Sequence, residues 1–177
     1  MSEAADTEAL GETPAYVLLD GSFLIDRPVD VVWPLILEYT SWQQYSSADH
    51  ISGKAGHVGE VVLLKKEEPG LENFPQYYAR TLKIEPCRRV VWKTWPAVAD
   101  QGPPFWGIVD FRVSDKDGRT RFTYSVYYEF ALQGEGQDAV SNFEAEMTNG
   151  FEELMSSVFP KLRNLAEHGY MAESATT

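Results

Sequence analysis

The feature that most constrains the fold of this chain is a long apolar stripe near its C-terminus. From about residue 138 to 167, large apolar residues recur at steps of three and four, the spacing of one face of an α-helix. The stripe consists of Phe143, Met147, Phe151, Leu154, Val158, Leu162 and Leu165. A helix of 30 residues is about 45 Å long, at roughly 1.5 Å per residue. Gly150 interrupts it at a cost of about 1 kcal/mol relative to alanine, which predicts a cavity or a close backbone contact there.

The residues before this stripe have a different period. Apolar and polar residues alternate, as in strands with one buried face. Strands are predicted at 16–25, 58–66, 77–85, 89–95, 106–113 and 119–130. Asp117-Gly118 is a strong hairpin signal, and Gly21 predicts a bulge or bend in the first strand. The later connections are too short for helical crossovers, so we expect an antiparallel meander.

Two short helices are predicted between the first two strands. Pro28 suits the first turn of a helix, and apolar residues follow it with helical spacing as far as residue 39. Pro34 should kink or shorten this helix. Residues 41–45 can form a second short helix.

These elements predict one α+β domain. A curved antiparallel sheet of about six or seven strands surrounds the long C-terminal helix and leaves a central cavity. Aromatic residues make up 13% of the chain, and the polar atoms of Tyr and Trp favour a partly wet interior over a dry one. The domain is expected to span residues 14–168, between a disordered acidic tail at 1–13 and a flexible tail at 169–177.

Composition argues against several classes of partner. The net charge is −12, and the 15 Lys and Arg residues form no run longer than a pair, so nucleic acid and anionic membranes are not expected partners. The single cysteine, Cys87, allows no intrachain disulfide, which fits a reducing compartment. No secretory signal or apolar membrane span is visible. We therefore expect a cytoplasmic protein, either a monomer or a homodimer.

Five segments, in order, carry a family resemblance: GSFLIDRPVDVVWPLI, HVGEVVLLKK, IEPCRRVVWKTW, GRTRFTYSVYYEF and NGFEELMSSVFPKLRNLAEH. Together they resemble the SRPBCC superfamily of START and Bet v 1-like helix-grip domains, and within it the polyketide cyclase/dehydratase-like branch. The resemblance covers about residues 16–168 and implies a helix-grip fold with a ligand cavity. Family members include lipid carriers, hormone receptors, chaperone activators, cyclases, dehydratases and lyases, with no shared catalytic triad to carry over. The fold alone therefore does not settle the role.

Strand alternation identifies side chains that should face the cavity. Phe122, Tyr124 and Tyr128 share the uncharged face of the last strand, and Phe111 and Trp92 lie on the corresponding faces of earlier strands. The predicted ligand-binding residues are Trp42, Tyr45, Trp92, Trp106, Phe111, Phe122, Tyr128, Phe143, Met147 and Phe151. For any single one of them, plain core packing is the alternative.

Arg80 is the sharpest polar candidate. If Leu82 and Ile84 face inward, the same alternation carries Tyr78 and Arg80 inward. A buried arginine needs a partner, and Glu60 on a neighbouring strand is the candidate. The pair would orient or activate a ligand at a polar pole of the cavity. The alternatives are an arginine that reaches solvent at a strand end and a purely structural ion pair.

Few other residues are candidates for a catalytic role. His50, next to Asp49 at the expected cavity mouth, is a candidate acid or base, with a solvated loop histidine as the alternative. The predicted catalytic set is Arg80, Glu60, Tyr78, His50 and Tyr124. The three histidines have no metal-ligand spacing, and no nucleophile or nucleotide-binding motif occurs. No metal or cofactor is therefore expected.

Three classes of function follow. The first is an enzyme that acts on an apolar, aromatic or polycyclic small molecule by cofactor-free acid/base chemistry, as a cyclase, dehydratase or lyase. The second is a non-catalytic small-molecule or lipid carrier. The third is a protein-interaction module such as a chaperone activator.

Overall fold

The computed structural model describes residues 12–67, 75–97 and 103–169. The fold is α+β, with seven antiparallel strands in the order β1-β7-β6-β5-β4-β3-β2. The strands are β1 (Glu12–Ile25), β2 (Ser47–Ser52), β3 (Val61–Lys65), β4 (Tyr77–Glu85), β5 (Arg89–Pro96), β6 (Phe105–Lys116) and β7 (Arg119–Gln133). The helices are α1 (Val29–Leu37), the 3-10 turn η1 (Tyr39–Ser41) and α2 (Gln137–His168). This is the predicted curved sheet with a long C-terminal helix.

Local turn chemistry fixes the register of the longest strands. Asp117 and Gly118 have φ values of 56° and 77°, the left-handed conformations that a two-residue hairpin requires. They join β6 to β7 and confirm the predicted hairpin. β1 pairs with β7 along its whole length without a shift in register. The register therefore excludes a bulge at Gly21.

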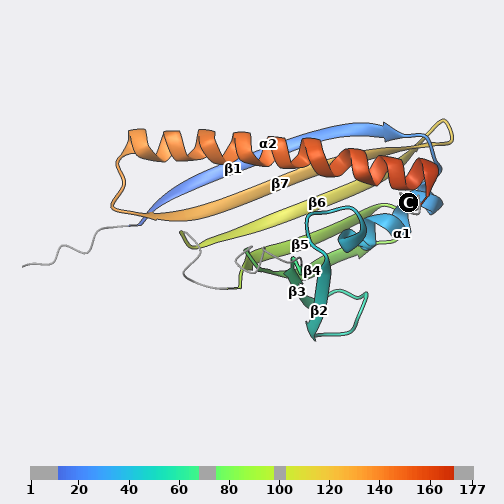
Figure 1. The fold of residues 1–177 in the computed structure, drawn as a ribbon, viewed down its shortest axis with the longest axis horizontal. Helices are drawn as coiled ribbons and strands as arrows, with labels where there is room; N and C mark the ends of the chain where they lie inside the picture. The colour runs from blue at the N-terminus through green and yellow to red at the C-terminus, as the bar shows by residue number, and fades with distance from the viewer. Residues whose placement is uncertain (1–11, 68–74, 98–102, 170–177) are drawn as a thin grey trace, which may run out of the picture.

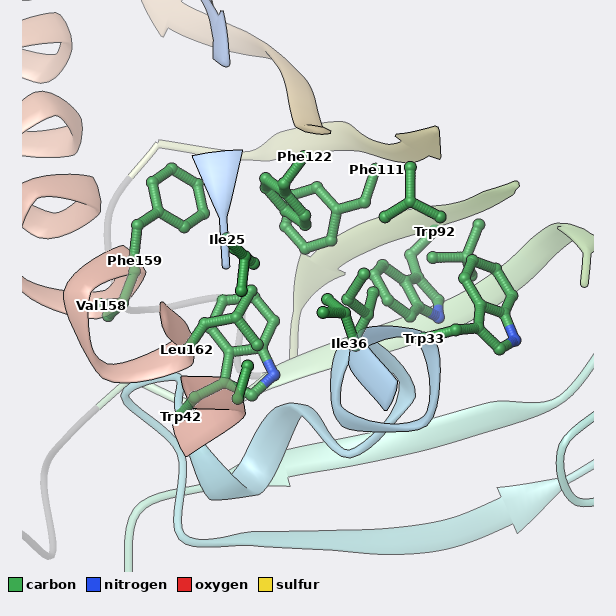
Figure 2. Close-up of a cluster of buried hydrophobic side chains, with 14 residues drawn as sticks. Ile25, Trp33, Ile36, Trp42, Trp92, Phe111, Phe122, Val158, Phe159 and Leu162 are labelled. Atoms are coloured by element: carbon green, nitrogen blue, oxygen red, sulfur yellow. The ribbon is translucent and has the colours of Figure 1, made fainter. Parts of the chain in front are cut away.

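Helix α2 covers the inner face of the sheet. Its backbone runs beside β1 and approaches α1 near its C-terminal end (Figure 1). Figure 2 shows Val158, Phe159 and Leu162 on α2, with the ring of Phe159 extending toward Phe122 of the sheet. These side chains belong to one buried apolar cluster that also includes residues of α1. The apolar stripe read from the sequence is thus the face of α2 that packs against the sheet.

Several boundaries differ from the predictions. The prediction of a second short helix at 41–45 is wrong: only η1 is present, and residues 42–45 follow it in non-helical form. The strand predicted from residue 58 begins at Val61, and Val58 is exposed. β2 was not predicted, because all of its residues but Ser47 are exposed, which leaves no burial pattern to detect.

β1 begins at Glu12, two residues inside the segment predicted to be a disordered tail. At the other end, α2 stops at His168 and Gly169 follows with φ 74°. Residues 1–11 and 170–177 lie outside the described residues. Within the described part of the chain, no helix is both long enough and apolar enough to cross a membrane.

The outer face of the sheet carries a buried carboxylate. Arg89 binds Asp110 through two hydrogen bonds of 2.9 and 2.7 Å, and Arg112 binds it through two of 3.3 and 2.6 Å. Burial by itself would raise the pKa of the Asp110 carboxyl, but the hydrogen bonds from Arg89 and Arg112 hold that pKa below its ordinary value. The three residues lie on adjacent strands and fasten β5 to β6.

We predict that Asp110→Asn lowers the free energy of unfolding at pH 7 by about 1–3 kcal/mol, because it removes charged hydrogen-bond partners from two arginines. The folded-state pKa of Asp110 lies below the unfolded value of about 3.9. Its ionised form therefore stabilises the fold above that pH, and this contribution is lost as the pH falls through the folded pKa. Urea unfolding between pH 7 and pH 3 should show a smaller acid-induced loss in the variant than in the wild type. Asp115→Asn, an exposed site on the same strand, is the control and should behave as wild type.

Gly150 contradicts the structural role expected from the sequence. It is exposed, and a Cβ atom placed there would meet nothing within 4 Å. Neither a close backbone contact nor a cavity explains this glycine. We predict that Gly150→Ala raises the free energy of unfolding by about 0.8–1 kcal/mol, the difference in helix propensity. Urea denaturation measures the change, and a destabilised variant would show that the glycine has a structural role after all.

Candidate ligand-binding site

A cavity of about 110 Å³ lies between the inner face of the sheet, α2 and the segment after η1. The segment after η1 contributes Trp42, Gln43, Gln44 and Tyr45. The strands contribute Leu64, Tyr77, Ala79, Trp92, Thr94, Phe105, Val109, Phe111, Val126 and Tyr128. Helix α2 contributes Phe151, Leu154, Met155, Val158 and Phe159. Most of these side chains are apolar. The sheet and the segment after η1 together contribute seven aromatic rings, three of which are phenols.

The sheet wall is built by strand alternation and held by ring contacts. Trp92 and Phe111 meet edge to face with centroids 5.6 Å apart, and Trp42 packs on Phe111 at 5.9 Å. Trp42 also donates a hydrogen bond of 2.9 Å from its indole nitrogen to the Leu35 carbonyl oxygen. This bond satisfies the polar atom of a ring that is only 1% exposed. It also fixes the segment after η1 as a wall of the cavity.

Tyr128 can line the cavity because Gly107 stands opposite it. The two residues are direct partners across β6 and β7. A Cβ atom on Gly107 would collide with the Tyr128 ring, so the absence of a side chain lets the ring lie over the neighbouring strand. On its other side, the ring stacks on Phe151 of α2 at 4.5 Å with an interplanar angle of 8°. Tyr128 therefore bridges the sheet and helix walls.

The polar side chains of the lining include four hydroxyls, from Tyr45, Tyr77, Thr94 and Tyr128, and the amides of Gln43 and Gln44. Burial raises the pKa of Tyr77 and that of Tyr128 to about 12. Burial raises the pKa of Tyr45 as well, with further contributions from Tyr128 and Tyr77. The nearby Thr94 hydroxyl lowers the pKa of Tyr128 and so offsets part of the rise that burial causes. Thr94 Oγ1 is itself buried and makes no hydrogen bond of ordinary geometry with the described residues. At neutral pH, these phenols are protonated hydrogen-bond donors.

Six of the ten residues predicted to bind a ligand line this cavity. They are Trp42, Tyr45, Trp92, Phe111, Tyr128 and Phe151. The other four lie elsewhere. Phe122 is 0% exposed and packs behind the cavity wall, and Phe143 and Met147 join a second apolar cluster with β1. Trp106 lies on the outer face of the sheet, where Lys93 Nζ is 5.2 Å from its ring centroid.

The predicted position of Arg80 is wrong. Arg80 is exposed, and Ala79 and Thr81 are the buried residues of this part of β4. A bulge between Thr81 and Lys83 changes the alternation, so Ile84 packs against the core while Leu82 is 41% exposed. Counting back from Ile84 by strict alternation therefore places Arg80 on the wrong face of the sheet. Arg80 forms no ion pair with another described residue and cannot be a polar pole of the cavity.

The other predicted catalytic residues also lie outside the cavity. Tyr78 stacks on Trp95 with centroids 5.6 Å apart, on the outer face. Glu60 accepts a hydrogen bond of 2.7 Å from the Gly56 backbone amide and lies 3.2 Å from His50 Nδ1, which places both side chains at the β2–β3 connection. Tyr124 lines a separate groove between β1 and α2. The structure brings Glu60 and His50 together, but not with Arg80, Tyr78 or Tyr124.

Sequence reasoning missed several lining residues. Tyr77 and Phe105 come at the first positions of their strands, where alternation has not yet set a face. Gln43 and Gln44 lie in a segment that was expected to be helical. Thr94 lies two residues from Trp92 on the same face of its strand, so a polar side chain on an otherwise apolar face was a usable signal. Among the described residues, no group of three or more His, Cys, Asp or Glu side chains is placed to hold a metal ion.

Comparison with solved structures identifies the fold. An uncharacterized protein from Rhizobium leguminosarum has a TM-score of 0.63 at 10% identity, over 88% of this chain and 97% of that protein. Protein CV1439 from Chromobacterium violaceum has a TM-score of 0.59 at 12% identity, over 85% and 96%. Ara h 8.0201 has a TM-score of 0.58 at 10% identity, over 85% and 97%. No protein-family model matches the chain, and no curated protein matches it in sequence.

The chain has the helix-grip fold. These likenesses cover almost the full length of each compared protein. They confirm the helix-grip fold that the sequence predicts. At identities of 10–12%, these likenesses show a shared fold and do not show a shared function.

We predict that Gly107→Ala destabilises the protein by about 1–3 kcal/mol, because Tyr128 is held between Gly107 and Phe151 and cannot move away. Gly21→Ala is the matched control. Gly21 faces Tyr124 in the same way on the neighbouring strand pair, but Tyr124 borders a groove into which its ring can shift. Urea unfolding should show a clearly smaller loss for Gly21→Ala. Equal losses would contradict the tight confinement of Tyr128.

Proposed function

We propose that the protein binds a small apolar molecule with a single ring in the cavity around Tyr128. The observation that supports this proposal is the lining: aromatic and aliphatic side chains surround an apolar space, and the described lining contains no charged residue. The volume of about 110 Å³ is comparable to an engineered apolar cavity of about 150 Å³ that takes up benzene. A polycyclic or long-chain ligand would require the walls to move apart.

The same lining favours binding over acid/base catalysis. Proton abstraction needs a carboxylate, an imidazole or another base within hydrogen-bond reach of the substrate. Among the described lining residues, the ionisable groups are phenols whose pKa values are raised by burial. Protonated phenols can donate a proton or a hydrogen bond, but they cannot act as bases at neutral pH. A non-catalytic carrier or binding protein is therefore the function that we propose.

A cofactor-free cyclase, dehydratase or lyase is the second candidate. It corresponds to the polyketide cyclase/dehydratase-like branch that the sequence resembles. One observation favours it: Tyr128 is a protonated donor in a low-dielectric site, where a hydrogen bond to a developing oxyanion is strong. Such an enzyme would use the phenol as an acid, and a water molecule or the substrate itself would have to supply the base.

Toluene binding tests the proposed function. Titration of the protein with toluene should change the fluorescence of Trp42 and Trp92, because both rings line the cavity. Leu154→Phe adds volume to the helix wall of the cavity and should weaken toluene binding at least tenfold. Met147→Phe adds volume to α2 outside the cavity and should leave the affinity unchanged.

Calorimetry and thermal unfolding complete this test. Both variants must unfold cooperatively for the comparison to count. Failure of the wild-type protein to bind toluene, or equal binding by the Leu154→Phe variant, would contradict a ligand-binding function for this cavity.

A further inference from the structure

The phenols of the cavity are grouped at one end of it. Tyr45 and Tyr77 meet edge to face with centroids 5.9 Å apart. Tyr77 packs on Phe105 at 5.8 Å, and Phe105 packs edge to face on Tyr128 at 5.7 Å. The strands β4, β6 and β7 therefore bring Tyr77 and Tyr128 against Phe105, and the segment after η1 brings Tyr45 against Tyr77. This end of the cavity is polar, whereas the end near Phe159 is apolar.

This polar end has hydrogen-bonding capacity that the described residues do not use. The Tyr77 hydroxyl makes no hydrogen bond to another described residue. Beside Tyr128, Thr94 Oγ1 is buried without a hydrogen-bond partner among the described residues. Buried polar groups are normally paired, and an exception usually indicates a missing partner. A ligand oxygen placed between Tyr77 and Tyr128 would supply one.

The same end has nothing to neutralise a charged ligand. The described lining residues include no Lys, Arg or His and no Asp or Glu. Moving an ion out of water into such a space is costly unless a counter-charge accompanies it. The raised pKa values of Tyr45 and Tyr128 show this effect on the protein's own groups, since burial disfavours the phenolate form of each. A ligand carboxylate would meet the same cost.

We infer that the ligand is a neutral single-ring molecule whose hydroxyl or carbonyl oxygen is hydrogen-bonded by Tyr77 and Tyr128. This inference rests on the proposed ligand-binding function and adds the chemical class of the ligand. The apolar ring lies toward Phe159 and Val158, and the oxygen lies toward the phenols. Arylalkyl alcohols and aryl ketones belong to this class, whereas aryl carboxylates and arylalkyl ammonium ions do not.

Four probes of nearly equal size separate the contributions of shape, polarity and charge. They are toluene, benzyl alcohol, benzoate and benzylamine, and their dissociation constants can be measured by calorimetry at pH 7. We expect benzoate and benzylammonium to bind at least about 100-fold more weakly than benzyl alcohol, because each loses its hydration without gaining a counter-charge. Toluene should bind to the same cavity.

Two variants assign the hydrogen bonds. Tyr128→Phe and Tyr77→Phe should each weaken benzyl alcohol binding about three- to tenfold, the usual effect of one hydrogen bond, and leave toluene binding within about twofold. Tyr124→Phe is the matched control. Tyr124 lies four residues from Tyr128 on the same face of β7, but it borders the separate groove. Its substitution should change neither affinity.

The outcomes distinguish this inference from the function on which it rests. If toluene binds but benzoate binds as well as benzyl alcohol, the neutral-ligand inference fails while the binding function stands. The hydrogen-bond assignment fails if Tyr128→Phe and Tyr77→Phe weaken benzyl alcohol and toluene binding equally, or affect neither. If no probe binds, toluene included, the proposed function itself fails.

Discussion

One helix has to cover the inner face of a seven-stranded sheet, and the rest of the structure follows from that constraint. An apolar sheet face must be buried against another layer, and α2 is the only long helix among the described elements. Its backbone lies close to β1 and α1, so it cannot also lie close to the central strands. Side chains must bridge the distance between α2 and β4–β6. Aromatic rings are the largest apolar groups available, which accounts for the high aromatic content of this chain.

Glycines opposite tyrosines make this bridging possible on the sheet side. Gly21 faces Tyr124 across β1 and β7, and Gly107 faces Tyr128 across β6 and β7. In each pair, the glycine leaves room for the ring to lie over the neighbouring strand. Tyr124 then packs on Phe159 at 4.6 Å and Tyr128 on Phe151 at 4.5 Å. The two glycine–tyrosine pairs thus connect β7 to positions about two turns apart on α2, and the unfilled space beside the second pair is the cavity.

The sequence predicted the fold more fully than the site, for a physical reason. Helical and strand periods depend on many residues, so one irregularity does not hide α2 or the β6–β7 hairpin. The face of a single residue depends on the phase of its strand, and one extra residue reverses that phase. The bulge after Thr81 does this in β4, and no glycine or proline marks it. Tyr128 was placed correctly because β7 alternates without a break from Phe122 to Phe130.

The two walls of the cavity differ in how they are held. Strands β5, β6 and β7 form a continuous hydrogen-bonded ladder, and the ion pairs of Asp110 reinforce it from outside. Helix α2 is fastened to β1 near its two ends, where Glu144 accepts a hydrogen bond from the Tyr16 amide and Glu167 accepts one from the Asp26 amide, each of 2.8 Å.

The stretch of α2 between those two anchors meets the cavity only through side chains, which include the flexible Met155. Backbone hydrogen bonds resist displacement along a whole strand, whereas side-chain contacts can rearrange one rotamer at a time. We therefore expect a ligand larger than the cavity to displace the middle of α2 and leave the sheet unchanged. The hydroxyl groups of Tyr77 and Tyr128 would keep their positions, because they belong to the wall that does not move.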